Sequence, residues 1–280
     1  MIDVYDIDWN LSWNDPRQFN SGNKADCSNR WNDKELCKNF DAAAKRDNYR
    51  NSMRRIEGMR LTEDSRVLDI GAGPGSIAIP LSKIVSHVTA VEPSEGMRQC
   101  LFDNMAERSI SNISVVPKTW QDVDIGKDLN GPYDVVFASY SLGVPDLREA
   151  LLKMNEVAEK YVYIFWFADM ISHWKKFYKP IWKELFGVPP IEKRCPNIIY
   201  NLLHQLGIYA NVEVTKSLNS TVYASIDDAV KDQAQGLLLT DDSQFAVLRD
   251  FLSEKMRRED GKYYLENMSY QAKIWWEKDF

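Results

Sequence analysis

The architecture of this chain follows from one short stretch, Val67-Leu68-Asp69-Ile70-Gly71-Ala72-Gly73-Pro74-Gly75. An apolar run with a single carboxylate leads into three glycines at alternate positions, and apolar residues then recur at helical spacing. This order predicts a strand, a tight turn and a helix. Glycine suits a turn that needs a positive φ, or one where a missing Cβ lets a ligand lie against the main chain. The first turn of the helix would offer free N–H groups to an anionic part of that ligand.

Strands and helices alternate downstream of this turn. Continuous apolar runs separated by amphipathic helices are typical of a parallel sheet that is covered on both faces. The expected strands lie at 67–70, 88–91, 113–116, 134–138, 161–167, 209–215 and 268–276, and the expected helices at 39–58, 97–105, 147–159 and 197–206. We therefore predict an α/β fold with three layers.

Composition disfavours several classes of protein. The 280 residues include 35 Lys and Arg against 41 Asp and Glu, a formal charge of −6, so a broad basic surface for nucleic acid is not expected. The sequence has no apolar run near the roughly 18 residues of a membrane span, and residues 1–6 lack the apolar core of a secretory signal. We expect a cytoplasmic protein without stable membrane association. Its four cysteines form no CxxC pair, so we expect reduced thiols and no metal site. The oligomeric state has no signal in the sequence.

Two acidic residues flank the glycines and indicate what the turn binds. Glu92 ends the second expected strand, where a carboxylate can accept hydrogen bonds from ribose hydroxyls. A dinucleotide-binding turn has the spacing G-x-G-x-x-G, whereas Ser76 occupies the place of the third glycine here. Asp69, just before the turn, would repel a pyrophosphate and attract an ammonium group. S-adenosylmethionine has an amino-acid end, a ribose and an adenine but no phosphate, so it is the expected cofactor.

The chain resembles the class I, Rossmann-like S-adenosylmethionine-dependent methyltransferases, of the type found in ubiquinone and menaquinone biosynthesis. The stretches that carry the resemblance are the glycine turn, Val91-Glu92-Pro93-Ser94 with Met97, residues 134–140 and residues 201–208. The resemblance implies a mostly parallel sheet with an antiparallel last strand.

The resemblance also implies which residues contact the cofactor. Asp69 and the backbone of the glycine turn would hold the methionine end, Glu92 the ribose, and residues 93–97 the adenine. Tyr140 would lie beside the sulfonium, although it is equally compatible with a core position. The residues implied at the cofactor are Tyr49, Asp69, Gly71, Ala72, Gly73, Gly75, Glu92, Pro93, Ser94, Met97, Thr119, Trp120, Gln121 and Ser139.

Two of these implied positions differ from the usual family pattern. Thr119 stands where the family often has an acidic residue for the adenine amine. Trp120 and Gln121 would substitute, by stacking and by an amide contact. Tyr49, or its neighbour Arg50, would close over the cofactor from the preceding helix.

The chain divides into a core and three segments that do not fit the alternation. The core comprises 63–168, which binds the cofactor, its continuation at 193–221 and the last strand at 263–280. The three other segments are 1–62, an N-terminal arm and helix; 169–192, a lid insertion; and 222–262, a helical insertion. The arm and the two insertions would form a helical cap over the open edge of the sheet.

The aromatic residues of the cap indicate the character of the methyl acceptor. Seven aromatic and aliphatic residues in 174–186 recur at helical spacing opposite four lysines, and Pro180 interrupts the pattern. We interpret such a stripe first as a helix packed on the domain and second as a lid over an apolar pocket. A membrane-surface helix is the third interpretation. Trp9, Trp13 and Trp31 would add aromatic walls. We expect a small, partly apolar or aromatic acceptor under the cap, with His173 as the first candidate general base and Tyr140 beside the reacting atoms.

Three alternatives stay open on the sequence alone. Cys27, Cys37 and Cys195 lie in cap segments, as thiolates of a metalloid or thiol methyltransferase would. An NAD-dependent oxidoreductase has a related turn, which the glycine spacing and Asp69 argue against. A non-catalytic cofactor-binding regulator would need a separate effector domain, and the sequence has none that we recognise.

Overall fold

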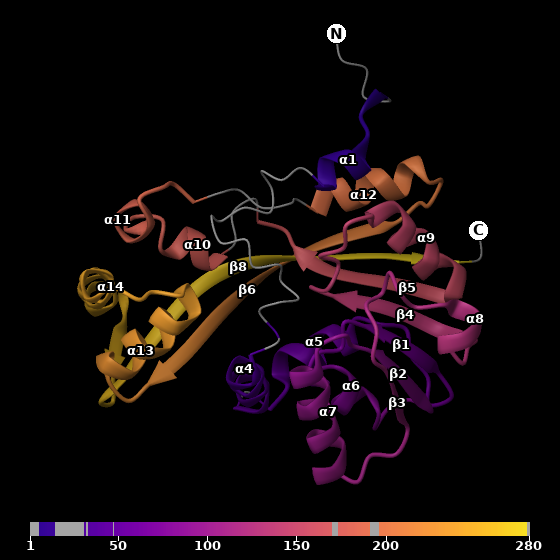
Figure 1. Cartoon of the computed structure of the whole chain (residues 1–280), viewed down its shortest axis with the longest axis horizontal. Coiled ribbons are helices and arrows are strands. Elements are labelled where there is room, and N and C mark those ends of the chain that lie inside the picture. The colour runs from indigo at the N-terminus through magenta and orange to yellow at the C-terminus, as the bar shows by residue number, and fades with distance from the viewer. Residues whose placement is uncertain are drawn as a thin grey trace.

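The computed structural model describes residues 6–14, 31, 33–46, 48–169, 173–190 and 196–278, apart from the side chains of Asn14, His173, Trp174 and Pro196. Figure 1 shows an elongated molecule with an α/β core at one end and a smaller group of helices at the other. Two long strands, β6 and β8, run through both parts. The carboxyl ends of β4 and β5 point from the core towards the smaller group.

In the described residues, eight strands form one sheet in the order β3-β2-β1-β4-β5-β8-β6, with the short β7 paired on β8. The strands are β1 (Arg66–Ile70), β2 (His87–Val91), β3 (Ile113–Val116), β4 (Tyr133–Ser139), β5 (Ala158–Phe167), β6 (Asn211–Tyr223), β7 (Arg257–Glu259) and β8 (Lys262–Glu277). β1 to β5 are parallel, and β8 runs antiparallel to both β5 and β6. The predicted parallel sheet with an antiparallel last strand is confirmed.

Helices cover both faces of this sheet, which makes the predicted three layers. On one face, α5 (Arg50–Glu57), α6 (Ala78–Leu81) and α7 (Glu95–Glu107) share an apolar core with β1, β2 and β4, and α4 (Lys34–Arg46) packs on α7. On the other face, α9 (Leu147–Val157), α12 (Pro196–Gln205) and the arm helix α1 (Trp9–Asn14) share a second core. The short α8 (Ile125–Asp128) precedes β4.

Two helix predictions need correction. The single helix expected over 39–58 is wrong, because Asn48 and Tyr49 have left-handed φ angles of 52° and 57° and separate α4 from α5. The helix after the glycine turn is only four residues long, and Pro80 is its third residue. Proline is tolerated there because N–H groups of a first helical turn have no partner within the helix.

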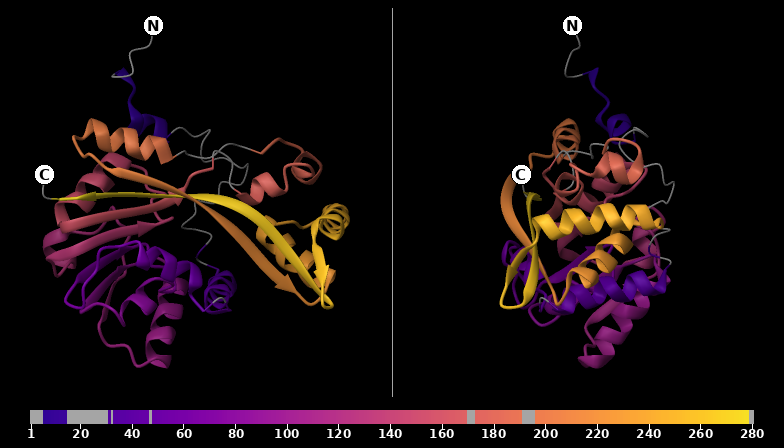
Figure 2. Two further views of the ribbon diagram at one scale, coloured as in Figure 1. Left: turned by 180° about the vertical axis from the view of Figure 1, so that it is seen from behind. Right: turned by 90° about the vertical axis from the view of Figure 1, so that its left-hand side faces the viewer.

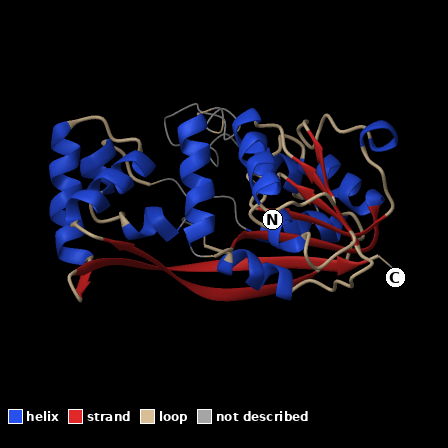
Figure 3. Ribbon diagram, turned by 90° about the horizontal axis from the view of Figure 1, so that it is seen from below, coloured by secondary structure: helices blue, strands red, loops and turns tan. Residues whose placement is uncertain are grey.

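The outer half of the β6–β8 ribbon carries a separate group of helices, here called the distal lobe. It contains α10 (His173–Phe177), α11 (Trp182–Phe186), α13 (Ile226–Leu237) and α14 (Asp242–Lys255), together with β7. Figures 2 and 3 show these helices on one side of the ribbon. Tyr178, Trp182 and Leu185 are buried against α13, α14 and the ribbon. Pro180 lies in the turn between α10 and α11, so the predicted stripe is two short helices packed into a core.

Candidate functional site

The glycine turn begins where β1 ends, and it is held to the neighbouring strand. The N–H groups of Gly71 and Ala72 both donate to the Val91 carbonyl, at 2.8 and 3.1 Å. Gly71 has a φ of 73°, and a Cβ at this position would lie 2.3 Å from the Cβ of Ser141. No side chain fits there. The turn therefore lies directly against the residues that follow β4.

The other two glycines differ in what surrounds them. Gly75 has a φ of 81°, and a Cβ there would lie 2.5 Å from Leu101 Cδ1 on α7, so it closes the turn onto the helix. Gly73 has a φ of 58°, but a Cβ there would meet no atom within 4 Å. The backbone of Gly73 thus borders open space, where a ligand can approach the main chain.

Glu92 links the second strand to this turn. Its Oε2 accepts from the Gly73 N–H at 2.8 Å and its Oε1 accepts from the Ser94 N–H at 2.7 Å. The side chain is only 6% exposed. Burial raises the pKa of Glu92, while the two backbone hydrogen bonds and Arg98 oppose that rise. Each carboxylate oxygen keeps a further lone pair for a ligand hydroxyl.

Asp69 is the least satisfied group of the site. It is 2% exposed, and its Oδ2 has no hydrogen-bond partner. Burial raises the pKa of Asp69 well above its usual range, and the nearby Glu92 carboxylate raises it further, whereas Arg55 lowers it. A buried acceptor without a donor is costly. A cationic donor at this place would both satisfy the oxygen and favour its ionised form.

Ser139 ends β4 and Tyr140 follows it, next to the turn. Arg55 of α5 donates from Nη1 to Ser139 Oγ at 2.9 Å, and its guanidinium lies 5.3 Å from the centroid of the Tyr140 ring. Tyr140 has a left-handed φ of 58°, a strained conformation for a bulky residue. Burial raises the pKa of Tyr140, so its phenol stays protonated at neutral pH.

Four aromatic rings, one of them that of Tyr140, meet at the carboxyl ends of β4 and β5. Phe167 and Trp166 lie 4.6 and 6.4 Å from the Tyr140 ring, and Trp13 of α1 lies 5.6 Å from Trp166. This set of Trp13, Tyr140, Trp166 and Phe167 is here called the aromatic cluster. Its position is where parallel α/β sheets bind ligands, outside the carboxyl ends of the strands.

The residues predicted to border the adenine contact the N-terminal arm. Ser94 begins α7 by accepting from the Met97 N–H, and its Oγ donates to the Trp31 carbonyl at 2.6 Å. Met97 is buried with Cys37 and Cys100 under Trp31. Burial raises the pKa of both thiols, which keeps them protonated. Pro93 connects Glu92 to this cluster.

Trp120 and Gln121 contact α9, whereas Thr119 contacts its own loop. The Trp120 indole donates to the Ala150 carbonyl at 3.2 Å, and Lys153 donates to the carbonyls of Trp120 and Gln121. Thr119 donates to Asp122. A part in binding adenine stays a prediction for all three.

Two further predicted residues are placed differently from the rest. Tyr49 is buried in the core beneath α5, with Arg108 over its ring at 5.8 Å and its hydroxyl without a partner. The backbone of His173 begins α10, but its side chain lies outside the described residues, as do Cys27 and Cys195.

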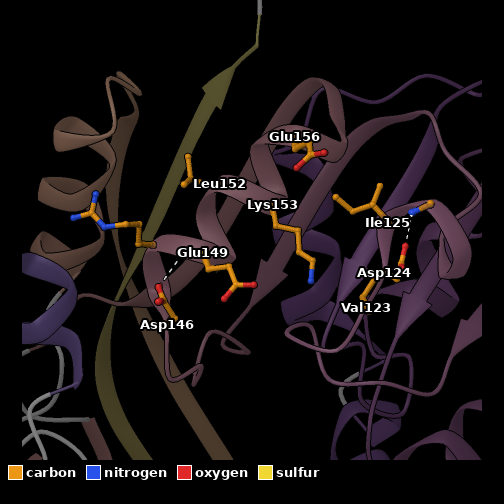
Figure 4. Close-up of a pocket in the computed structure, with 10 residues that line it drawn as sticks. Val123, Asp124, Ile125, Asp146, Glu149, Leu152, Lys153 and Glu156 are labelled. Carbon is orange, nitrogen blue, oxygen red and sulfur yellow. Dashed lines mark hydrogen bonds between the residues drawn. The ribbon is translucent and has the colours of Figure 1, made fainter.

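A hollow of about 490 Å³ lies along the outer side of α9 (Figure 4). It is lined by charged side chains of both signs, among them Asp124, Glu149 and Lys153. Asp69, Glu92 and the glycine turn are not part of its lining. This hollow is therefore separate from the predicted cofactor site.

Sequence reasoning missed Arg55 and Trp166. Arg46, Arg50 and Arg54 recur every four residues in the sequence, and all three are exposed. Arg55 is one residue further on and faces Ser139. A signal for Trp166 was available, because it is the second-last residue of a strand whose carboxyl end faces the site.

No helix in the described ranges is both long and apolar enough to cross a membrane. Within the same ranges, no three His, Cys, Asp or Glu side chains are grouped so that they could hold a metal ion.

Comparison with known proteins agrees with this fold. The family model described as a methyltransferase domain matches residues 28–167, half of the chain. An uncharacterized protein of Haemophilus influenzae is 30% identical over 196 residues, which cover 65% of this chain and 69% of that protein. Protein-L-isoaspartate O-methyltransferase 1 of Geotalea uraniireducens is 34% identical over 106 residues, 38% of this chain and 46% of that enzyme. A SAM-dependent methyltransferase from Aquifex aeolicus superposes with a TM-score of 0.50 at 20% identity, covering 65% of this chain and 92% of that one.

Proposed function

The chain belongs to the methyltransferase domain family and is an S-adenosylmethionine-dependent methyltransferase, and from this premise we propose that its acceptor is a small, partly apolar or aromatic molecule. The acceptor would bind at the aromatic cluster, beside the glycine turn. The closer resemblance to quinone-biosynthesis enzymes stays a prediction. So do the assignments of individual residues given below.

The residues around the turn fit S-adenosylmethionine. The unpartnered Oδ2 of Asp69 suits a donor such as the ammonium of the methionine end. The open space at Gly73 suits a ligand lying on the backbone, and the Glu92 oxygens suit the ribose hydroxyls. When bound, the cofactor supplies a methyl carbon activated by a sulfonium. Arg55, held between Ser139 and Tyr140, suits the carboxylate of the same methionine end.

The observation that carries the acceptor proposal is the aromatic cluster next to the turn. Ser139 and Tyr140 lead directly into Ser141, which touches Gly71. The rings of Tyr140, Trp166 and Phe167 therefore lie close to the residues that we propose for the cofactor. Aromatic side chains bury large apolar area and favour flat, apolar ligands by stacking. A small aromatic or apolar acceptor matches these walls.

Methyl transfer makes modest chemical demands on the protein. It is an in-line displacement, and holding the nucleophile against the methyl carbon can contribute about 7–11 kcal/mol of the barrier reduction. The aromatic cluster would orient the acceptor and exclude water. The protonated Tyr140 phenol can donate a hydrogen bond to the acceptor, but it cannot act as a base at neutral pH. A proton lost from the nucleophile would need another group, and His173 remains our candidate.

The arm helix α1 is our candidate for part of the proposed cap. Asn10 is bonded to Asp146 at 3.2 Å and to the Arg148 N–H at 3.0 Å, and Trp13 donates to the Val144 carbonyl at 3.1 Å. These bonds hold α1 over the loop that follows β4. A segment bound there would shield the acceptor from solvent. The distal lobe would bound the same region from the opposite side.

The competing activities lack support. Metalloid transfer needs thiolates, but Cys37 is buried under Trp31 and, like Cys100, has a raised pKa. The family assignment favours neither nicotinamide chemistry nor a regulator without catalysis.

The acceptor proposal is tested by turnover. Purified full-length protein with S-adenosylmethionine would be assayed for S-adenosylhomocysteine release against small aromatic amines, phenols and acids, and separately against peptides and RNA. We expect turnover with a small aromatic. For that acceptor, Phe167→Leu should raise the KM roughly tenfold through lost stacking area and leave S-adenosylhomocysteine affinity unchanged. Phe102→Leu, an exposed position on α7, is the matched control and should change neither. Turnover confined to peptides or RNA would refute the acceptor proposal.

A further inference from the structure

Trp166 is the residue of the aromatic cluster whose polar atom is unsatisfied. Its side chain is 8% exposed, and its indole N–H is buried without a hydrogen-bond partner. Other indoles of the chain are bonded: Trp13 to the Val144 carbonyl, Trp120 to the Ala150 carbonyl and Trp276 to Asn155 Oδ1. A buried donor left unpaired lowers stability. Such groups in a native protein call for a missing partner or a functional reason.

The position of this N–H suggests which partner is missing. Trp166 lies at the carboxyl end of β5, and its ring is nearly parallel to that of Tyr140, at 28° and 6.4 Å. Tyr140 in turn lies beside Arg55 and the glycine turn. A ligand seated on the Tyr140 ring would therefore lie next to the ring of Trp166. The other indoles named above already donate to the protein and cannot serve in this way.

We propose that the Trp166 indole N–H selects the methyl acceptor by donating a hydrogen bond to it. The substrate class is then an aromatic molecule that carries a hydrogen-bond-accepting oxygen, such as a carbonyl or carboxylate, rather than a pure hydrocarbon ring. This inference rests on the small-acceptor function proposed above and narrows it. A site with a buried donor discriminates against analogues that lack the matching acceptor, because the donor is then left unpaired.

Access to the indole requires movement of α1. The N–H is sealed from solvent, and α1 covers Trp166 through the ring of Trp13, 5.6 Å away. The polar contacts of this six-residue helix and the residue before it include the two of Asn10, the Trp13 indole bond and a bond from Gln205 to the Ile7 carbonyl. Local opening of one short segment costs less free energy than unfolding the whole domain. The acceptor would therefore enter as α1 lifts.

The test compares two probes that differ in one oxygen. Acetophenone and ethylbenzene would be titrated into full-length protein saturated with S-adenosylhomocysteine, with the indole N–H signals followed by NMR on ¹⁵N-tryptophan-labelled protein. The signal absent from Trp166→Phe identifies Trp166. We expect acetophenone to bind about three- to tenfold tighter than ethylbenzene, the yield of one hydrogen bond, and to move the Trp166 proton downfield.

Two variants make the outcome decisive. Trp166→Phe should bind both probes equally, with S-adenosylhomocysteine affinity unchanged. Trp276→Phe, which removes a satisfied indole from the core, should keep the preference for acetophenone. A preference that survives in Trp166→Phe, equal binding of the probes by the natural protein, or a Trp166 signal that does not move overturns this inference alone. If the loaded protein binds neither probe, the small aromatic acceptor itself is refuted, and this inference falls with it.

Discussion

Replacing Asp69 by asparagine should move two measurable quantities in opposite directions. The ligand-free protein should become more stable, while its affinity for S-adenosylmethionine and S-adenosylhomocysteine should fall. Both effects come from one structural fact: the carboxylate is 2% exposed, has an oxygen without a partner and lies near Glu92. Asparagine keeps the shape and removes the charge.

The stability effect follows from the direction of the pKa change. The folded protein raises the pKa of Asp69 above its unfolded value, so the native state holds this proton to higher pH. Asp69 therefore makes its full contribution to the free energy of unfolding below its unfolded pKa, and that contribution is lost as the pH rises through its folded pKa. At neutral pH the carboxylate opposes folding. Asp69→Asn should raise the unfolding free energy by about 1 kcal/mol, or roughly 2–4 °C in Tm at this chain length.

The binding effect is larger because an ion pair is lost. Removing one partner of a buried, hydrogen-bonded charge pair costs about 2–5 kcal/mol. The asparagine oxygen can still accept one neutral hydrogen bond, so we expect a loss of about 3 kcal/mol, or roughly 150-fold in Kd. In the natural protein the affinity should also rise with pH as Asp69 loses its proton, and Asp69→Asn should lack that dependence.

Calorimetry with S-adenosylhomocysteine and thermal unfolding of ligand-free protein measure both quantities. Asp134→Asn is the matched control, because Asp134 accepts from the Arg66 N–H at 2.8 Å, pairs with Lys160 and has a lowered pKa. That variant should lose stability and keep its affinity. An Asp69→Asn protein that is less stable than the natural one, and binds S-adenosylhomocysteine equally well, would refute the reasoning.

Three further predictions concern the same surface. Glu92→Gln leaves one acceptor oxygen for two backbone N–H groups, so calorimetry should show about tenfold weaker S-adenosylhomocysteine binding; unchanged affinity would contradict this. In Gly75→Ala, the new Cβ would clash with Leu101 at a position of positive φ, so urea unfolding should show a loss of about 2–4 kcal/mol in unfolding free energy. Gly73→Ala should lose only about 1–2 kcal/mol but should bind S-adenosylhomocysteine more weakly. Equal losses of unfolding free energy in the two variants would contradict this prediction. Arg55→Lys removes the planar guanidinium that bonds Ser139 and lies over the Tyr140 ring, so kcat/KM should fall about tenfold; full retention would remove Arg55 from the site.

The fold was largely readable from the sequence because its signals are local. The apolar runs of β1 to β5 and the glycines after β1 each act over a few residues, and the structure has the strands and the turn where these signals lie. The prediction of a single helix over 39–58 was wrong because its periodicity carries no signal for the break inside it. Asn48 and Tyr49 adopt left-handed angles that the helical periodicity of their neighbours does not reveal.

By itself, the sequence determined the strand–turn–helix at residues 67–81, the two carboxylates that flank it and hence the class of cofactor, because chemistry and chain geometry couple there over adjacent residues. Only the tertiary structure decided which distant side chains meet at that turn. Arg55 reaches Ser139 across 84 positions, and Trp13 covers Trp166 from the arm. Packing also turned Trp120 towards α9 and left the Trp166 indole without a partner. Such contacts depend on how whole layers pack, since a side chain's partners are set by burial and register between segments that share no local pattern.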